Sequence, residues 1–242
     1  MAIFLMIHGA WHDGSTFEPL RAGLEAQGHR LIAPDLPGMG ADRTPYADVT
    51  LDRWAGFVAD IARAQPEPVI LCGHSRGGVV ISQAAESAPE AIAKLVYITA
   101  FLIPDGTSLN DHVSDVPRVP AFEEGIAPIE GGLALSLTPE GATAAFYHRV
   151  APEKLPAALS HICPEPTVVL GTPLAITDAR FGAIERHYIE CTDDQAIPIA
   201  QQRSFRAKLP VASVSSLDSD HSPFLTCPDQ LVDALDRIAR GG

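Results

Sequence analysis

The stretch that decides the fold is Val69-Ile70-Leu71-Cys72-Gly73-His74-Ser75-Arg76-Gly77-Gly78-Val79-Val80-Ile81. Its first four residues are apolar throughout, which predicts a buried strand, and the apolar run after the glycines predicts a helix. Between them stands the pattern G-x-S-x-G, which places a serine on a strained turn from strand to helix. Glycines are needed two positions either side of Ser75, because larger side chains would collide with the neighbouring strand and helix. The helix start offers amide donors and the positive end of a dipole, so we expect Ser75 to be a nucleophile.

Five further short, mainly apolar runs predict strands of the same sheet, at Ile3 to Ile7, Arg30 to Ala33, Leu95 to Thr99, His187 to Cys191 and Val211 to Leu217. Runs that are apolar rather than alternating suit parallel strands that are covered on both faces. Amphipathic stretches lie between them: one begins after the helix-capping Thr50, and another starts near Pro228 and ends before Gly241. This alternation predicts an α/β fold with a doubly wound parallel sheet of about six strands.

The segment between Thr99 and His187 breaks the alternation. No convincing strand continues the main pattern there, prolines are frequent, and short helices are plausible at 138–150 and 152–162. A structureless loop of this length would be abnormal in a compact domain. We therefore predict a helical cap at residues 104–184, inserted into a core formed by residues 1–103 and 185–242.

Composition and charge exclude several classes of function. The 242 residues carry 17 Lys and Arg against 30 Asp and Glu, a net charge of −13, which disfavours binding to nucleic acid or to anionic membranes. The apolar N-terminal run is too short to span a bilayer and has no basic leader of a secretion signal. The four cysteines are widely spaced, which predicts reduced thiols in a cytoplasmic protein, without a disulfide framework or a zinc site.

A nucleophilic serine needs a base, and the base needs an acid that orients it. After an elbow of this kind the acid comes next in the chain and the histidine last. His221 is the only histidine after the last predicted strand, so we expect it to be the base. The acid should follow the strand that ends at Cys191, where Asp193 and Asp194 compete, and spacing alone barely separates the two.

The oxyanion of the reaction needs two amide donors. One should be the amide of Arg76, directly after the nucleophile, and the other the amide of Ala10, in the loop that follows the first strand. His8 and His12 lie in that loop rather than on a helix, which disfavours a metal pair.

Several segments together resemble a known family: His8 to His12, Gly73 to Gly78, Arg180 to Pro198, and Asp220-His221 followed by Cys227-Pro228. They are similar to α/β-hydrolases of the plant methylesterase and hydroxynitrile lyase group, with related bacterial esterases such as pyrethroid hydrolases. The resemblance covers nearly the whole chain, more loosely in the cap. It implies the α/β-hydrolase fold and a triad of Ser75, Asp194 and His221, and so favours Asp194 over its neighbour.

The same resemblance bears on the choice between two chemistries. Lyases of this group carry a lysine soon after the catalytic histidine and a threonine in the H-x-x-x-H segment, whereas this chain has Ser222 and Gly9 at those places. Ester hydrolysis is therefore favoured. Arg76 departs from the Leu or Met common after the nucleophile. Because a cation at a helix start opposes the dipole, its side chain is expected either to pair with a cap acid on the surface or to contact an anionic or carbonyl-rich substrate.

The sequence thus predicts a serine carboxylesterase for small to medium apolar aryl or alkyl esters, with no cofactor and no metal. A hydroxynitrile lyase on the same triad, and a ligand-binding receptor of negligible turnover, are the alternatives. A homodimer is possible. The expected apolar walls of the substrate pocket are Trp11, Phe101, Phe122, Phe146 and Phe181.

Overall fold

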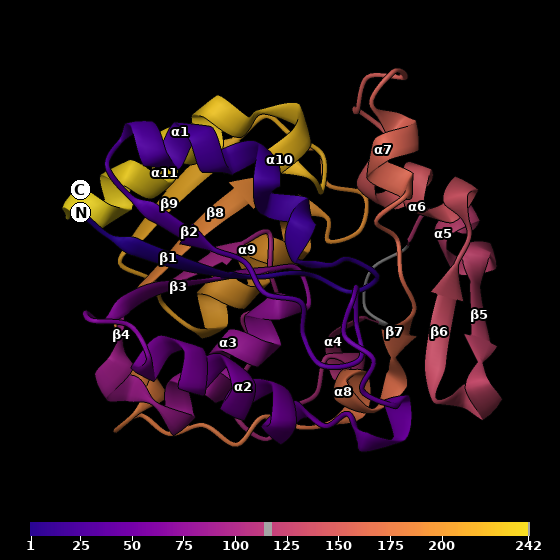
Figure 1. Cartoon of the computed structure of the whole chain (residues 1–242). Coiled ribbons are helices and arrows are strands. Elements are labelled where there is room, and N and C mark those ends of the chain that lie inside the picture. The colour runs from indigo at the N-terminus through magenta and orange to yellow at the C-terminus, as the bar shows by residue number, and fades with distance from the viewer. Residues whose placement is uncertain (114–117, 242) are drawn as a thin grey trace.

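A six-stranded parallel sheet forms the centre of the molecule, as the computed structural model shows for residues 1–113 and 118–241 (Figure 1). The strand order is β2-β1-β3-β4-β8-β9, and every neighbouring pair is parallel. The strands are β1 (Ile3–Ile7), β2 (Arg30–Ile32), β3 (Val69–His74), β4 (Ile92–Ile98), β8 (Arg186–Cys191) and β9 (Ser213–Leu217). All six strands predicted from the apolar runs are confirmed, with ends that differ by a few residues.

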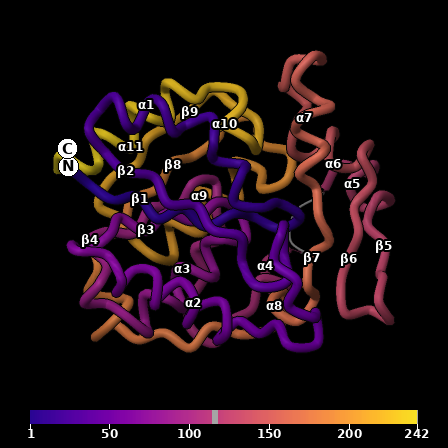
Figure 2. Tube along the Cα trace, in the orientation of Figure 1, coloured from indigo at the N-terminus to yellow at the C-terminus, as the bar shows by residue number. Residues whose placement is uncertain are grey.

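Helices cover both faces of this sheet, which explains why its central strands are mainly apolar. One face carries α2 (Leu51–Arg63), α3 (Gly77–Ser87) and α9 (Ile199–Lys208), and the other carries α1 (Arg21–Ala26), α10 (Pro223–Thr226) and α11 (Pro228–Arg240). Alternate residues of β1 belong to the two hydrophobic clusters on these faces. The Cα trace in Figure 2 shows β1 and β3 in the middle of the molecule, with the two chain termini close together.

The expected helix boundaries are present for the two longest helices. The Thr50 hydroxyl accepts a hydrogen bond from the Arg53 amide at 3.0 Å and so caps α2. At the other end of the chain, α11 ends at Gly241, whose φ of 86° is a left-handed conformation that glycine adopts without strain.

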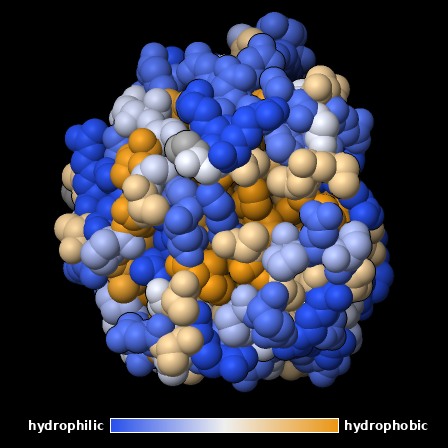
Figure 3. All heavy atoms as spheres, turned by 90° about the vertical axis from the view of Figure 1, so that its left-hand side faces the viewer, coloured by the Kyte–Doolittle hydropathy of each residue, from blue (hydrophilic) through white to orange (hydrophobic). Residues whose placement is uncertain are grey.

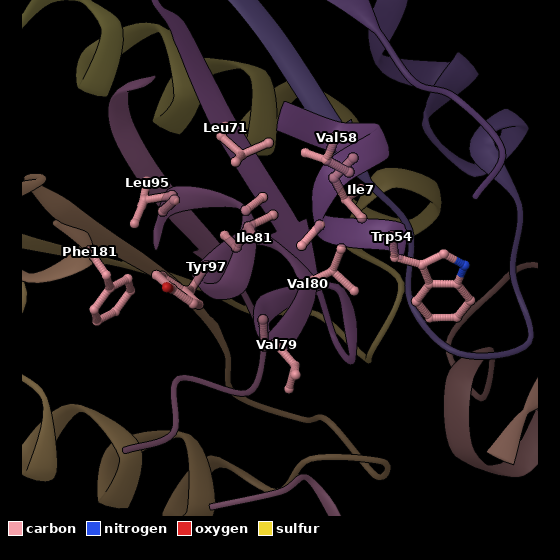
Figure 4. Packing of buried hydrophobic residues seen from close by; sticks show 14 of the residues in the cluster. Ile7, Trp54, Val58, Leu71, Val79, Val80, Ile81, Leu95, Tyr97 and Phe181 are labelled. Carbon is pink, nitrogen blue, oxygen red and sulfur yellow. The ribbon is translucent and has the colours of Figure 1, made fainter. Parts of the chain in front are cut away.

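The larger of the two clusters lies between the sheet and α2 and α3. Figure 4 shows Ile7, Leu71 and Leu95 of the strands facing Val58 and Val80 of these helices. Their burial supplies the main driving force for this layered arrangement. On the side of the molecule away from the cap, Figure 3 shows apolar residues gathered in the middle of the face and hydrophilic residues around them.

The segment between β4 and β8 contains a second, smaller sheet as well as helices. Its helices are α4 (Asn110–Val113), α5 (Pro120–Gly125), α6 (Pro139–Phe146), α7 (Leu155–Leu159) and α8 (Thr167–Gly171), and its antiparallel strands are β5 (Ile126–Ile129), β6 (Ala134–Leu137) and β7 (Glu165–Pro166). The predicted helices of the cap are present, but the small antiparallel sheet beside them was not expected. These strands are short, and two of them contain proline, so they lack the pattern that marks the main strands. The boundaries at 104 and 184 stay a prediction.

Short 3₁₀ turns complete the described structure, at η1 (Gly14–Leu20), η2 (Tyr46–Asp48), η3 (Pro89–Ala91), η4 (Glu130–Gly132) and η5 (Phe181–Ala183). Among the helices of the described residues, none has the length and apolar character needed to cross a membrane.

Candidate active site

The candidate residues all follow carboxyl ends of the parallel strands, where sites of open α/β sheets lie. Ser75 comes directly after β3, and the loop 8–12 follows β1. Asp194 lies three residues beyond β8, and His221 lies four residues beyond β9. In Figure 1, β5, β6 and α5 to α7 stand beyond this edge of the sheet. The segment between β4 and β8, called the cap segment below, therefore lies over the candidate site.

Ser75 occupies the strained turn that the sequence predicts. Its φ is 54°, a left-handed conformation that is uncommon for any residue but glycine. A Cβ on Gly73 would lie 2.7 Å from the backbone of Gly77, and a Cβ on Gly77 would lie 2.5 Å from the Ile7 carbonyl oxygen. The two glycines are therefore required for the close approach of strand, turn and helix.

His221 and Asp194 form a buried hydrogen-bonded pair. His221 Nδ1 lies 2.7 Å from Asp194 Oδ2, and both side chains are almost fully buried. The amides of Ala196 and Ile197 donate to Asp194 Oδ1 at 2.7 and 2.8 Å, and the hydroxyl of Thr99 donates to Oδ2. Because the carboxylate accepts the proton on Nδ1, the other ring nitrogen of His221 is left as the basic one.

The structure separates the two competing aspartates. Asp193 points to the surface, where 49% of its side chain is exposed and its carboxylate lies 3.2 Å from His148 Nε2. Asp193 also lies within 3.7 Å of the Arg149 guanidinium. Of the adjacent carboxylates, only Asp194 reaches the imidazole of His221, which is the arrangement that the family resemblance implied.

His221 Nε2 is buried and has no hydrogen-bond partner among the described residues. Its ring lies against that of His74, which precedes Ser75, with centroids 4.6 Å apart, and His74 Nε2 donates to the His221 carbonyl at 2.8 Å. The ring centroid of Phe146, which lines the same cavity as Ser75, lies 5.2 Å from that of His221. A buried ring nitrogen without a partner is a group suited to taking a proton.

Two backbone amides beside Ser75 have no acceptor among the described residues, those of Ala10 and Arg76. The loop of Ala10 comes very close to Ser75, because a Cβ on Gly9 would lie 2.9 Å from the Ser75 Cβ. These are the amides expected to bind an oxyanion.

A small cavity of about 130 Å³ opens onto Ser75. Four of the five expected walls line it, namely Trp11, Phe101, Phe122 and Phe146, together with other mainly apolar residues of the cap segment. Phe181 lies elsewhere: it packs in the main core beside Tyr97 (Figure 4). A larger hollow of about 580 Å³, between η1, α7 and α10, does not include Ser75.

The Arg76 side chain is buried, which corrects one expectation. Only 1% of it is exposed, and its Nε lies 3.0 Å from Oε1 of Glu165, a fully buried carboxylate of β7. The expectation of a partner acid in the cap is confirmed, but its place on the surface is wrong. Burial lowers the pKa of the Arg76 guanidinium and raises that of the Glu165 carboxyl, and the charge of each partner opposes both shifts.

Sequence reasoning missed three residues around the site. Thr99 and Glu165 contact expected site residues, and Arg118 lines the cavity with its guanidinium 5.5 Å from the ring of Phe122. Thr99 directly follows a strand end and could have been considered on that ground. Nothing in the sequence singles out the other two. Among the described residues, no group of three or more His, Cys, Asp or Glu is arranged to hold a metal.

Comparisons with known proteins identify the family of the chain. Residues 4–234 match the model of the alpha/beta hydrolase family. The chain is 34% identical over 240 residues to the pyrethroid hydrolase of Sphingobium wenxiniae, which covers 96% of this chain and 85% of the relative. It is 30% identical over 251 residues to methylesterase 1 of Arabidopsis thaliana, covering 98% of this chain and 95% of the relative.

Two further similarities widen the picture. An alpha-hydroxynitrile lyase of Arabidopsis thaliana is 29% identical over 255 residues, covering 98% of this chain and 96% of the lyase. The crystal structure of a pyrethroid hydrolase from Sphingobium faniae matches with a TM-score of 0.88 at 32% identity, over 99% of this chain and 97% of that one. By the family match and the identity along nearly the whole chain, this protein belongs to the alpha/beta hydrolase family.

Proposed function

We propose that this protein is a carboxylic ester hydrolase that works through Ser75, His221 and Asp194. The observation that carries the proposal is the state of the His221 ring. Its Nδ1 is bonded to a buried carboxylate at 2.7 Å, while its Nε2 is buried without a partner among the described residues. That arrangement leaves one nitrogen of His221 ready to accept a proton, and we assign Ser75, which is held on a strained turn, as the proton donor.

In the first half of the reaction, Ser75 Oγ attacks the ester carbonyl carbon, and its proton passes to His221 Nε2. The carbonyl oxygen becomes an oxyanion, which accepts hydrogen bonds from the amides of Ala10 and Arg76. The C–O bond of the ester then breaks, the alcohol leaves with the proton from His221, and the acyl group remains on Ser75.

In the second half, water replaces the alcohol. His221 Nε2 takes a proton from the water, the resulting hydroxide attacks the acyl carbon, and the same amides bind the new oxyanion. Ser75 leaves with the proton from His221, which releases the acid and restores the enzyme. Asp194 keeps the proton on Nδ1 and stabilises the imidazolium in both halves.

The substrates we propose are small to medium apolar esters. The cavity beside Ser75 is lined mainly by aromatic and aliphatic side chains, which favour an apolar acyl or alcohol group. The relatives named pyrethroid hydrolase and methylesterase 1 act on esters by their names, and they are 34% and 30% identical to this chain.

A hydroxynitrile lyase is the rival chemistry, since one relative carries that name. A lyase has to stabilise a departing cyanide, which calls for a cation beside His221. The residue after His221 is Ser222, and the Arg76 guanidinium is held by Glu165. Arg118 is the remaining cation among the described residues that line the cavity, and its pKa is lowered by burial.

A panel of substrates tests the proposal. The wild type is offered p-nitrophenyl and methyl esters of increasing chain length, and mandelonitrile is run beside them. We expect ester hydrolysis and no cyanide release above the buffer rate. Cyanide release that disappears in Arg118→Leu would favour the lyase, and tight binding of esters without turnover would favour a receptor.

A further inference from the structure

We infer that the buried Arg76–Glu165 ion pair is a positioning device that aims the Ala10 amide at the oxyanion. This inference rests on the proposed function and adds two side chains to it. Neither side chain touches the substrate in this account. Arg76 would therefore serve the reaction twice, with its own backbone amide as one donor and with its guanidinium as the support of the other.

The pair joins three parts of the structure that meet behind the nucleophile. Arg76 comes from the elbow, Glu165 comes from β7 in the cap segment, and the guanidinium carbon lies 4.3 Å from the ring centroid of Trp54 in α2. The stacking on Trp54 fixes the plane of the guanidinium, and the carboxylate fixes its direction. The guanidinium is thus paired with Glu165, although Arg76 is also one of the residues that line the cavity beside Ser75. We therefore assign the cation to its partner carboxylate and not to an anionic substrate.

The guanidinium then reaches the oxyanion loop. Arg76 Nη2 donates to the Gly9 carbonyl at 2.9 Å, and His8 Nδ1 donates to the same oxygen at 3.0 Å. In a planar trans peptide the C=O and N–H bonds point in opposite directions. The N–H of the Gly9–Ala10 peptide belongs to Ala10. Holding the Gly9 oxygen on the guanidinium therefore turns the Ala10 N–H away from Arg76, and this amide has no acceptor among the described residues.

Glu165 holds the next peptide of the same loop. Its Oε2 accepts a hydrogen bond from the Trp11 amide at 3.2 Å, and it also lies 3.3 Å from Arg76 Nη2. Trp11 has a φ of 58°, an uncommon conformation for a large side chain that needs such support. The Ala10 carbonyl, at the other end of that peptide, accepts a hydrogen bond from His12 Nδ1 at 2.7 Å. Hydrogen bonds therefore fix both peptides that flank Ala10: the Gly9–Ala10 peptide through its carbonyl and the Ala10–Trp11 peptide at both ends.

The cost of burying two charges makes a purely structural role a weak explanation. Replacing a buried ion pair by apolar residues of similar volume is often neutral or stabilising. Two hydrogen bonds of this pair, to the Gly9 carbonyl and from the Trp11 amide, lie in the loop 8–12, which carries the Ala10 amide proposed to bind the oxyanion. The ion pair accordingly serves to position the Ala10 amide and not to stabilise the fold.

The test compares the wild type with the double variant Arg76→Met/Glu165→Leu, which removes both charges and keeps both backbone amides. Its measurements are kcat and KM for a p-nitrophenyl ester, and inhibition by a trifluoromethyl ketone. Ser75 Oγ adds to the carbonyl carbon of this ketone, and the resulting oxyanion faces the two backbone amides. The second inhibitor is the corresponding carboxamide compound, which is uncharged and binds without forming a covalent bond to Ser75.

We expect kcat and the affinity for the trifluoromethyl ketone to fall together by about 10- to 100-fold, less than the loss of one whole oxyanion donor. The KM and the affinity for the uncharged amide should change less than threefold. The matched control is Glu190→Gln, which removes a buried carboxylate that pairs with Arg203 and Arg206 and makes no hydrogen bond to the loop 8–12. Its kcat should stay within twofold of the wild type.

A double variant that is folded and retains kcat and ketone affinity would overturn the inference, and so would an equal loss for both inhibitors. Should the double variant not fold, Arg76→Lys decides. This variant keeps a positive charge near Glu165 but lacks the branched guanidinium that also donates to the Gly9 carbonyl. We therefore expect kcat to fall at least fivefold at unchanged KM, and a kcat equal to that of the wild type would refute the inference. If the wild type hydrolyses no ester, the proposed function fails, while the two inhibitors still test the positioning.

Discussion

Replacing Asp194 by asparagine should stop the proposed chemistry without changing the shape of the site. The two backbone amides of Ala196 and Ile197 donate to one oxygen of Asp194, and the His221 ring donates to the other. In the variant, the amide oxygen has to stay on the two backbone donors. Its NH₂ group then faces His221 Nδ1, which can only accept from it, so the ring proton moves to Nε2 and blocks the base.

The size of the effect follows from the alternative orientation. Turning the asparagine over would restore the acceptor for His221 but leave two buried amides without a partner, at a cost of about 1 to 3 kcal/mol each. The wrong tautomer therefore persists. We expect kcat to fall about 10⁴-fold, as in other triads with this change, which corresponds to about 5.4 kcal/mol in the activation barrier.

The assay is hydrolysis of a p-nitrophenyl ester, with urea unfolding to show that both variants fold. Asp193→Asn is the matched control, because that carboxylate is half exposed and pairs with His148 on the surface. It should keep kcat within about threefold, since exposed ion pairs contribute little. Full activity of Asp194→Asn, or an equal loss in Asp193→Asn, would refute the assignment of the acid.

Three further changes test neighbouring contacts. Thr99→Val removes the hydroxyl that donates to Asp194, so kcat should fall about three- to tenfold, as expected for the loss of one hydrogen bond. Thr99→Ser keeps a hydroxyl and should restore kcat, whereas an unchanged kcat in Thr99→Val would show that the contact has no role in the reaction. Gly9→Ala places a Cβ 2.9 Å from the Ser75 Cβ, so kcat should fall more than about 100-fold; near-normal turnover would show that the loop can move. Burial lowers the pKa of His12 from 6.5 to about 4, so stability is complete above pH 6.5 and is lost as the pH falls toward 4. His12 alone should lower the free energy of unfolding by about 2.5 kcal/mol at pH 4.5. Between pH 7.5 and 4.5, the free energy of unfolding measured with urea should therefore fall less for His12→Gln than for the wild type. An equal fall in both proteins would contradict the burial argument.

The sheet could be predicted because its signal is local. Each central strand is a short apolar run, and the covering helices carry their own start and stop residues, such as Thr50 and Gly241. The cap segment has no such signal. Its strand β7 has two residues, and β5 contains Pro128 and is partly exposed, so each strand is defined by its neighbour in space rather than by its own pattern.

The site shows the same division between local and distant information. Ser75 and His221 stand out by their position after strands, whereas the choice between the two aspartates depended on the family resemblance. The partner of Arg76 could not be found from the sequence, because Glu165 lies 89 residues away and is one of 30 acidic residues. Phe181 was expected as an apolar wall of the pocket, but an apolar side chain alone does not distinguish a cavity wall from the core.

Covalent labelling of Ser75 tests the central claim most directly. A p-nitrophenyl alkylphosphonate loses p-nitrophenolate when a serine oxygen attacks its phosphorus, so intact mass and peptide analysis report which residue reacted. We predict one label per chain, located on Ser75, with complete loss of ester hydrolysis. Ser75→Ala should remain unlabelled and lose about 10⁴-fold or more in turnover. Labelling of Ser75→Ala at the wild-type rate, or undiminished ester hydrolysis by it, would contradict the account.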